Sequence, residues 1–227
     1  MGMKAIAVMP AMNEAGRIGP AITGAFKHVQ NVIVVDDGSK DVTVEEAKKA
    51  GAIVLRHSLN RGQGAALKTG TQAALMLGAD VIVHIDADGQ HDPDMIPHML
   101  APITEGKSDV VFGSRFLGVS SEGMPFARRL LLGAAMVFNR LILGISKHIT
   151  DPQSGLRAMT ADAARKIDFK QDRMAHCSEI LRLVSRSDLR WMEVPVRIRY
   201  TADTLAKGQK PADAFKILWQ LLLGSFQ

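Results

Sequence analysis

The sequence predicts an α/β fold, in which an open and mostly parallel sheet carries helices on both faces. Over residues 1–115, short apolar runs alternate with stretches of helical pattern, which is typical of strands joined by crossover helices. The runs are continuous and rich in β-branched residues, as strands buried on both faces are. A chain of 227 residues with 47% hydrophobic and 22% charged residues has the size and composition of one globular domain.

Five strands are expected in the first half, and the segments between them carry helix end signals. Thr43 and Glu46 have the spacing of a capping box, and Gly51 would end that helix. A longer helix is expected over 64–77, and Asp92 before a proline predicts another helix start. The expected strands cover residues 4–9, 32–35, 52–55, 81–85 and 109–112.

The pattern changes after Arg115, and the second half reads as an elaboration on the first. We therefore predict one domain over residues 1–227, with halves 1–115 and 116–227. The second half is expected to hold a loop over 116–125, a long apolar helix over 126–146, helices over 160–167 and 174–187, a half-buried strand over 191–199, a loop over 201–211 and a final helix over 212–223.

Charge and cysteine content narrow the class of protein. The net charge of +5 favours an anionic partner, but 5% aromatic residues and the lack of a clustered basic stripe argue against nucleic acid. The single cysteine, Cys177, excludes an intramolecular disulfide and fits a cytoplasmic protein. The sequence shows no signal-peptide pattern and no run of about 18 apolar residues, so we predict no membrane span.

A polar cluster follows each of the five expected strands. Ligands of open α/β sheets bind outside the carboxyl ends of the strands, so these clusters are expected to meet at one edge. They cover residues 10–14, 36–39, 60–64, 86–91 and 113–115.

Two of these clusters contain paired carboxylates. Asp86 and Asp88 would repel each other unless a cation lies between them, and Mg²⁺ bound by one or two carboxylates and substrate phosphates fits this spacing. Asp36 and Asp37 could receive ribose hydroxyls or a base N–H. Asp37 is followed by glycine, so the same residues also fit a plain turn.

The third cluster begins a glycine-rich helix. Leu67 stands where both the Walker pattern and the dinucleotide fingerprint require glycine. The main sequence evidence for an ATPase or a dehydrogenase function is therefore absent. The remaining pattern, Gly62 with Arg61 and Lys68, suits an anionic sugar nucleotide. Lys68 equally fits an exposed helix lysine.

The second half adds further candidates. Asp151 and Arg157 bound a polar loop that fits either a site or a simple turn. His176 and Glu179 share a helix face, but two ligands do not make a zinc site, so Glu179 is expected as a site carboxylate and His176 as a structural residue. Cys177 is expected to be a small buried hydrophobe.

Eight short motifs spread along nearly the whole chain match one known family. They are PAMNE (10–14), VVDDGSKD (34–41), NRGQGAALKTG (60–70), DADGQHDP (86–93), GSR (113–115), DPQSGLRAM (151–159), EVPV (193–196) and KGQK (207–210). In these motifs the sequence resembles the family 2 glycosyltransferases of GT-A fold, above all the dolichyl- and polyprenyl-phosphate mannosyl- and glucosyltransferase branch.

The resemblance implies inverting transfer from a GDP- or UDP-sugar with Mg²⁺ or Mn²⁺, residues 1–115 holding the donor and 116–227 the acceptor. The nucleotide-sugar contacts it implies are Pro10, Asn13, Glu14, Asp36, Asp37, Arg61, Gly62, Lys68, Asp86 and Ala87. The implied metal ligands are Asp86, Asp88 and Gln90. The implied contacts of an acceptor phosphate are Arg115, Arg157, Lys207 and Lys210. The residues expected to be catalytic are Asp88, Arg115, Asp151 and Glu179.

The resemblance favours a polyprenyl phosphate as the acceptor. A lipid phosphate is already ionised at neutral pH and needs no strong base, whereas a hydroxyl needs a carboxylate, with Asp151 the first candidate and Glu179 the second. The apolar helices over 126–146 and 212–223 fit peripheral contact with a membrane, or equally core packing or a dimer interface. Two alternatives stay open: a soluble or glycan hydroxyl acceptor, and a non-catalytic nucleotide-sugar-binding protein.

Overall fold

The computed structural model describes residues 2–117 and 148–198. The helices expected over 126–146 and 212–223 and the loop over 201–211, with Lys207 and Lys210, lie outside these residues. Within the described ranges, no helix is long and apolar enough to cross a membrane.

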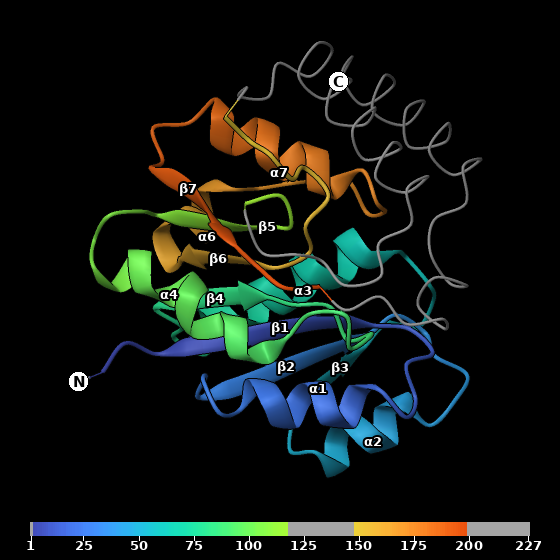
Figure 1. Ribbon diagram of the computed structural model, residues 1–227. Coiled ribbons are helices and arrows are strands. Elements are labelled where there is room, and N and C mark those ends of the chain that lie inside the picture. The colour runs from blue at the N-terminus through green and yellow to red at the C-terminus, as the bar shows by residue number, and fades with distance from the viewer. Residues whose placement is uncertain (1, 118–147, 199–227) are drawn as a thin grey trace.

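A seven-stranded sheet forms the centre of the molecule, with strand order β3-β2-β1-β4-β6-β5-β7 (Figure 1). The strands are β1 (Ala5–Ala11), β2 (Asn31–Asp36), β3 (Ile53–Arg56), β4 (Val81–His84), β5 (Val110–Ser114), β6 (Arg157–Thr160) and β7 (Trp191–Pro195). The first five strands confirm the expected elements, with shifts of one or two residues at their ends. Strand β7 confirms the expected strand in the second half, although it ends at Pro195.

The sheet is mostly parallel, as expected, but one strand departs from the pattern. β1 pairs in parallel with β2 and β4, β2 with β3, and β5 with β7. β6 runs antiparallel between β4 and β5 and separates them. Residues 157–160 were expected at the end of a polar loop and the start of a helix, so the prediction missed this strand.

Helices cover both faces of the sheet, which confirms the predicted layers (Figure 1). One apolar cluster packs α3, α6 and α7 against the sheet, and the other packs α1, α2 and α4 against the opposite face. The helices are α1 (Ile18–Ala25), α2 (Thr43–Lys49), α3 (Gln63–Met76), α4 (Ile96–Thr104), α6 (Ala161–Lys166) and α7 (His176–Ser185), and a short 3₁₀ helix, η1 (Pro93–Met95), precedes α4.

The helix end signals were right at three places and wrong at one. Asp92 caps η1 by accepting a hydrogen bond from the Asp94 amide, and Gly51 follows α2 with a φ of 89°. The capping box is absent, because Thr43 is itself the first residue of α2. The Thr43 hydroxyl instead accepts from the Glu14 amide, and the Glu46 carboxylate accepts from the Gly16 amide. Both side chains therefore hold the turn after β1. Gly78, which directly follows the helix expected over 64–77, also has a positive φ, 73°.

Candidate active site

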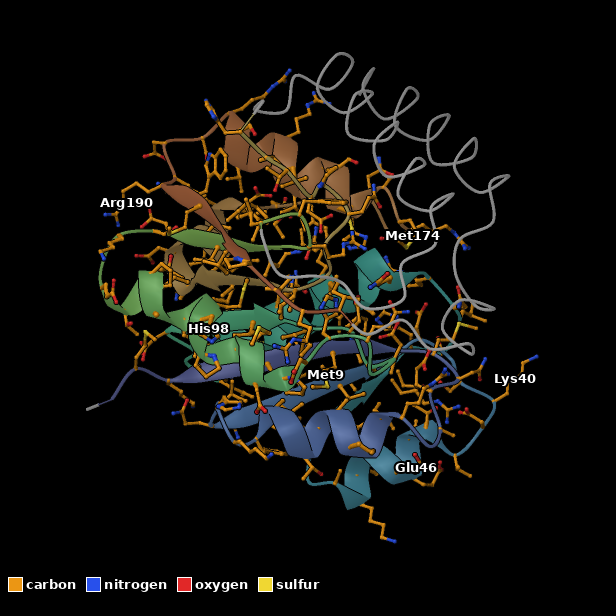
Figure 2. All side chains as sticks on the ribbon, in the orientation of Figure 1. Met9, Lys40, Glu46, His98, Met174 and Arg190 are labelled. Carbon is orange, nitrogen blue, oxygen red and sulfur yellow. The ribbon has the colours of Figure 1, made fainter. Side chains whose placement is uncertain are left out.

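The polar clusters meet at the carboxyl edge of the sheet, as expected from parallel strands. The amide of Asn13 donates to the Ser39 hydroxyl at 2.8 Å, which joins the ends of β1 and β2. In Figure 2, Lys40 and Arg190 lie far apart. Lys40 follows the carboxyl end of β2 and Arg190 precedes the amino end of β7, so the two labels mark the carboxyl and amino ends of the parallel strands. The site lies on the Lys40 side.

Asp36 and Asp37 are both buried, and protein groups occupy both carboxylates. Asp36 accepts from the Ser39 amide at 3.2 Å and lies 3.1 Å from the Arg56 guanidinium. Asp37 accepts from the Gly62 amide at 2.6 Å and from the Arg61 amide at 3.0 Å. Asp37 therefore fixes the loop before α3.

His57 also contacts Asp37, and it extends the same network to α3. Its Nδ1 lies 2.7 Å from Asp37 Oδ1, and its Nε2 lies 3.0 Å from the Thr69 hydroxyl. The loop is thus held at both ends, by backbone amides at Arg61 and Gly62 and by the imidazole of His57.

The glycines at the start of α3 are explained by close packing of another backbone segment, and not by the binding of an anionic sugar nucleotide that was expected there. A Cβ on Gly62 would lie 2.4 Å from the Asp172 carbonyl oxygen, and a Cβ on Gly64 would lie 2.1 Å from that of Gln171. The Ala65 amide donates to the Asp172 carbonyl at 3.0 Å. The backbone at 171–172 therefore packs on this helix start, and glycine is needed because no side chain fits there.

The two basic residues of this segment pair with carboxylates. Arg61 lies 3.3 Å from Asp172, and Lys68 lies 2.8 Å from Asp168, where it also donates to the Phe169 carbonyl. Both pairs are partly exposed, where ion pairs are weak. In this structure the two side chains join α3 to residues 168–172.

Asp86 and Asp88 follow β4, and their carboxylates differ in environment. Asp86 accepts from Gln63 Nε2 at 2.7 Å and lies 3.3 Å from His91 Nε2. Burial alone would raise the pKa of Asp86, but the hydrogen bond and charge of His91 and the charge of Arg157 hold it below its usual range. Burial and the neighbouring Asp86 charge raise the pKa of Asp88.

The residues after β4 fit a hard divalent ion. The Asp86 charge makes ionisation of Asp88 less favourable, and a cation bound between the two carboxylates would remove that cost. Gln90 adds an amide oxygen of the kind that Mg²⁺ or Mn²⁺ takes. Among residues 2–117 and 148–198, no group of three or more His, Cys, Asp or Glu side chains forms a complete metal cage. An ion held by Asp86, Asp88 and Gln90 would need further ligands, such as substrate phosphates.

Arg115 and Asp151 form a buried ion pair, which changes the expectation for Asp151. Arg115 Nε lies 2.6 Å from Asp151 Oδ2 and its Nη2 lies 2.7 Å from Oδ1. The Asp151 side chain is 0% exposed. The Arg115 amide also donates to Oδ2 at 3.1 Å and the Gln153 amide to Oδ1 at 3.3 Å, so each oxygen accepts two hydrogen bonds. In this structure Asp151 therefore positions Arg115 and has no free lone pair with which to remove a proton.

Glu193, in β7, holds the backbone of this ion pair in place. Its carboxylate accepts from the Thr150 amide at 2.9 Å and from the Asp151 amide at 3.0 Å. The Thr150 hydroxyl also donates to Glu193 at 2.7 Å. Glu193 belongs to the EVPV motif (193–196), but the motif alone did not predict this role.

Glu179 also organises backbone. Its Oε2 accepts from the amides of Lys170 and Gln171 at 2.9 and 2.8 Å. It thereby supports the segment whose next residues pack on the glycines of α3. Glu179 was expected to be a site carboxylate and the second candidate base, and in the structure its carboxylate is bound to this loop.

A second buried polar group lies between β6 and α7. Arg157 is 2% exposed. Its Nη2 donates to the Ser154 carbonyl at 2.9 Å and lies 3.4 Å from Cys177 Sγ. Its Nε and Nη1 have no hydrogen-bond partner among the described residues. Cys177 Sγ also lies 3.4 Å from His176 Nε2. Burial alone would raise the pKa of Cys177, but the charges of His176 and Arg157 lower it to about 6. Cys177 is buried as expected, yet it behaves as a polar group and not as a plain hydrophobe.

The remaining expected contacts lie along β1 and β4. Pro10 is a buried residue of β1, and Ala87 is buried beside Asp86. Glu14 pairs with Arg17 at 2.6 Å. Asn13 has a φ of 55°, and its side-chain oxygen accepts from the Lys40 amide at 2.9 Å. These residues lie at the same edge as Asp36 and Asp86.

Two further residues, both in contact with Asp86, were missed by sequence reasoning. Gln63 donates to Asp86, and Gly155 packs so closely on the Asp86 carboxylate that a Cβ there would lie 2.2 Å from Oδ2. A single glutamine or glycine carries no signal of such a contact, because it depends on segments distant in the chain.

Comparison with known proteins places this arrangement in a family. The model of glycosyl transferase family 2 matches residues 6–167. A UDP-N-acetylglucosamine–dolichyl-phosphate N-acetylglucosaminyltransferase of Methanococcus voltae is 34% identical, over 95% of this chain and 94% of its own. An undecaprenyl-phosphate mannosyltransferase of Micrococcus luteus is 32% identical, over 74% of this chain and 70% of its own.

A solved structure supports the fold assignment. Glucosyl-3-phosphoglycerate synthase of Mycobacterium tuberculosis, crystallised with Mn²⁺ and UDP-glucose, superposes with a TM-score of 0.68 at 23% identity, over 97% of this chain and 77% of its own. The fold is therefore GT-A, and the chain belongs to glycosyl transferase family 2 and is a glycosyltransferase.

Proposed function

We propose that this protein transfers a sugar from a GDP- or UDP-sugar to a polyprenyl phosphate, with inversion at the anomeric carbon and with Mg²⁺ or Mn²⁺. The observation that carries the choice of acceptor is the Arg115–Asp151 pair. Asp151 was the first candidate for a general base, and its two oxygens are bound at 2.6 and 2.7 Å by Arg115. An ionised phosphate needs no base, so it fits a site in which the first candidate base, Asp151, is bound by Arg115.

The names of the relatives agree with this acceptor. The Methanococcus voltae enzyme is named for a dolichyl-phosphate acceptor and the Micrococcus luteus enzyme for an undecaprenyl-phosphate acceptor. A polyprenyl chain lies in a bilayer, so the proposal includes peripheral contact of the protein with a membrane.

The donor would bind along the carboxyl ends of β1, β2 and β4. Pro10, Asn13, Glu14 and the Asp36 region would surround the base and ribose. When bound, the divalent ion would neutralise the leaving nucleoside diphosphate. Asp86, Asp88 and Gln90 would hold the ion, and the ion would bind the diphosphate.

The acceptor side would use positive charge. Arg157 is buried, so it would act on the site through its field and not by contact with the acceptor. Arg115 is held rigidly by Asp151, and a fixed guanidinium can bind and orient an ionised acceptor phosphate without reorganising. Lys207 and Lys210 remain proposed contacts of the acceptor phosphate.

A release assay tests the proposal. The protein is incubated with Mg²⁺ or Mn²⁺, a panel of UDP- and GDP-sugars, and a short polyprenyl phosphate, and the released nucleoside diphosphate is measured. We expect release that depends on both the metal and the polyprenyl phosphate. Asp88→Asn should abolish it, while Asp162→Asn, whose side chain is 88% exposed, should not.

The other outcomes identify the alternatives. Release that is indifferent to the lipid would refute the polyprenyl acceptor and favour a soluble or glycan hydroxyl. Nucleotide-sugar binding without turnover under any of these conditions would favour a non-catalytic binding protein. Full activity of Asp88→Asn would refute the metal assignment.

A further inference from the structure

The side chain of Gln63 reaches from α3 to the carboxylate after β4. Gln63 is the first residue of α3, and its Nε2 donates to Asp86 Oδ1 at 2.7 Å. Because the acceptor is charged, this hydrogen bond is of the stronger class. It is the described side-chain contact that joins the glycine-rich helix start to the D-x-D segment.

The backbone on either side of Gln63 is anchored, so its amide is held in one place. Before it, the Gly62 amide donates to Asp37 Oδ2 at 2.6 Å. After it, the Ala65 amide donates to the Asp172 carbonyl at 3.0 Å. The position of the Gln63 amide is therefore set by the end of β2 and by the 171–172 segment together.

Asp86 is confined from two further directions. Its Oδ2 lies 3.3 Å from His91 Nε2, and the backbone of Gly155 packs against the carboxylate so closely that a Cβ there would lie 2.2 Å from Oδ2. Gln63 is the contact on Oδ1. Without it, Oδ1 would lose its hydrogen-bond partner among residues 2–117 and 148–198, and the carboxylate could turn about its side-chain torsions.

The neutrality of Gln63 suits an oxygen that must also bind a cation. A carboxylate oxygen has about two lone pairs, so one hydrogen bond leaves Oδ1 able to accept another partner. A lysine or arginine in the same place would hold Asp86 equally well, but its charge would oppose a divalent ion. A glutamine orients the carboxylate and leaves its negative charge intact.

We infer that Gln63 is a positioning residue for the divalent ion, which it serves by fixing the Asp86 carboxylate in the orientation that binds the metal. This inference rests on the proposed function, because it takes Asp86 as a metal ligand. It adds a residue of α3 to a site otherwise formed after β4.

The test measures metal binding directly. Free Mn²⁺ is followed by electron paramagnetic resonance in mixtures of the protein with UDP or with GDP. Gln63→Met keeps the length of the side chain and removes the donor. Loss of a group that orients a metal ligand weakens metal affinity by about 10–100-fold, so we expect the Kd of Mn²⁺ to rise by about that factor.

Two controls separate positioning from general structure. Gln72→Met makes the same change at an exposed position of the same helix, and it should leave the Kd of Mn²⁺ unchanged. In Gln63→Met, the Kd of UDP or GDP measured without metal should stay within about twofold of the wild-type value. The Tm of Gln63→Met should stay close to the Tm of Gln72→Met. Raising the Mn²⁺ concentration should restore most of kcat in Gln63→Met.

The outcomes distinguish this inference from the proposed function. An unchanged Kd of Mn²⁺ in Gln63→Met would overturn the inference alone. An equal loss of metal-free nucleotide binding would also overturn it, since Gln63 would then support the fold in general. A wild-type protein that binds no Mn²⁺ with either nucleotide would overturn the proposed metal site and the inference with it.

Discussion

Replacing Gly155 with alanine should displace the Asp86 carboxylate. The backbone of Gly155 has no positive φ, so alanine is compatible with its conformation and the effect comes from contact alone. The new Cβ would lie 2.2 Å from Asp86 Oδ2, 2.8 Å from Cγ and 3.0 Å from Oδ1. All three atoms belong to the group that we propose binds the metal.

The size of the displacement follows from these distances. An ordinary contact between a Cβ and a neighbouring heavy atom begins at 3.4 Å, so Oδ2 and Cβ must separate by about 1.2 Å. The bond from Gln63 to Oδ1 is 2.7 Å long and would break or lengthen under such a shift. A misplacement of about 1 Å in a reacting site costs about 100-fold in rate, or about 2.7 kcal/mol of transition-state stabilisation.

The assay compares kcat/KM for release of the nucleoside diphosphate, together with the Kd of Mn²⁺, in Gly155→Ala and in Gly19→Ala. Gly19 lies in α1, and nothing lies within 4 Å of the position that a Cβ would occupy there, so its alanine variant should keep full activity and gain about 0.5–1 kcal/mol of stability. Wild-type kcat/KM and metal affinity in a folded Gly155→Ala would refute the steric argument.

Three further changes have expected outcomes. Asp37→Ala leaves the amides of Arg61 and Gly62 without their acceptor, and urea denaturation should show a loss of about 3 kcal/mol; a loss below 1 kcal/mol would mean that water replaces the carboxylate. The thiolate absorbance of Cys177 should titrate near pH 6, measured against Cys177→Ser as the blank, and a midpoint near pH 9 would contradict this. Because the pKa in the folded protein lies below the ordinary 9.0, the stability that the thiolate contributes is complete above pH 9 and is lost as the pH falls through 6. Glu193→Ala removes the acceptor of two backbone amides and should lower the free energy of unfolding by about 2 kcal/mol by denaturant titration, whereas an unchanged midpoint would show that this carboxylate holds nothing in place.

The sequence was most informative where strands are parallel and buried. Runs of β-branched residues located β1 to β5 within one or two residues, and parallel direction alone placed Asp36 and Asp86 at one edge. Such predictions succeed because they depend on local composition and on one rule of topology. The helix ends at Gly51 and Asp92 succeeded for the same reason.

Prediction failed where a residue serves a distant segment. Thr43 and Glu46 have the spacing of a capping box, yet both bind the turn at 14–16, which competes for the same side chains. Gly62 resembled a residue of a phosphate loop, but its lack of a side chain accommodates Asp172, more than 100 residues away. Neither partner can be read from the local pattern.

The site carboxylates show the same limit. Asp151 was the first candidate base for a hydroxyl acceptor, and only the folded chain brings Arg115 to both of its oxygens. Gln63 was passed over because a glutamine beside glycines is ordinary. Roles of this kind depend on which groups meet in space, and residue type restricts them only loosely.

The antiparallel strand β6 has a consequence for how the chain is made. Strands β2 and β4 can pair with β1 as soon as they leave the ribosome, because their partner has already been synthesised. Both neighbours of β5 lie downstream, so its two edges stay unpaired until β6 and β7 emerge. At about 5–20 residues per second, β5 waits on the order of a few seconds for β6. During that interval the nascent chain exposes the edges of an apolar strand, and it is then most open to aggregation or to capture by a chaperone.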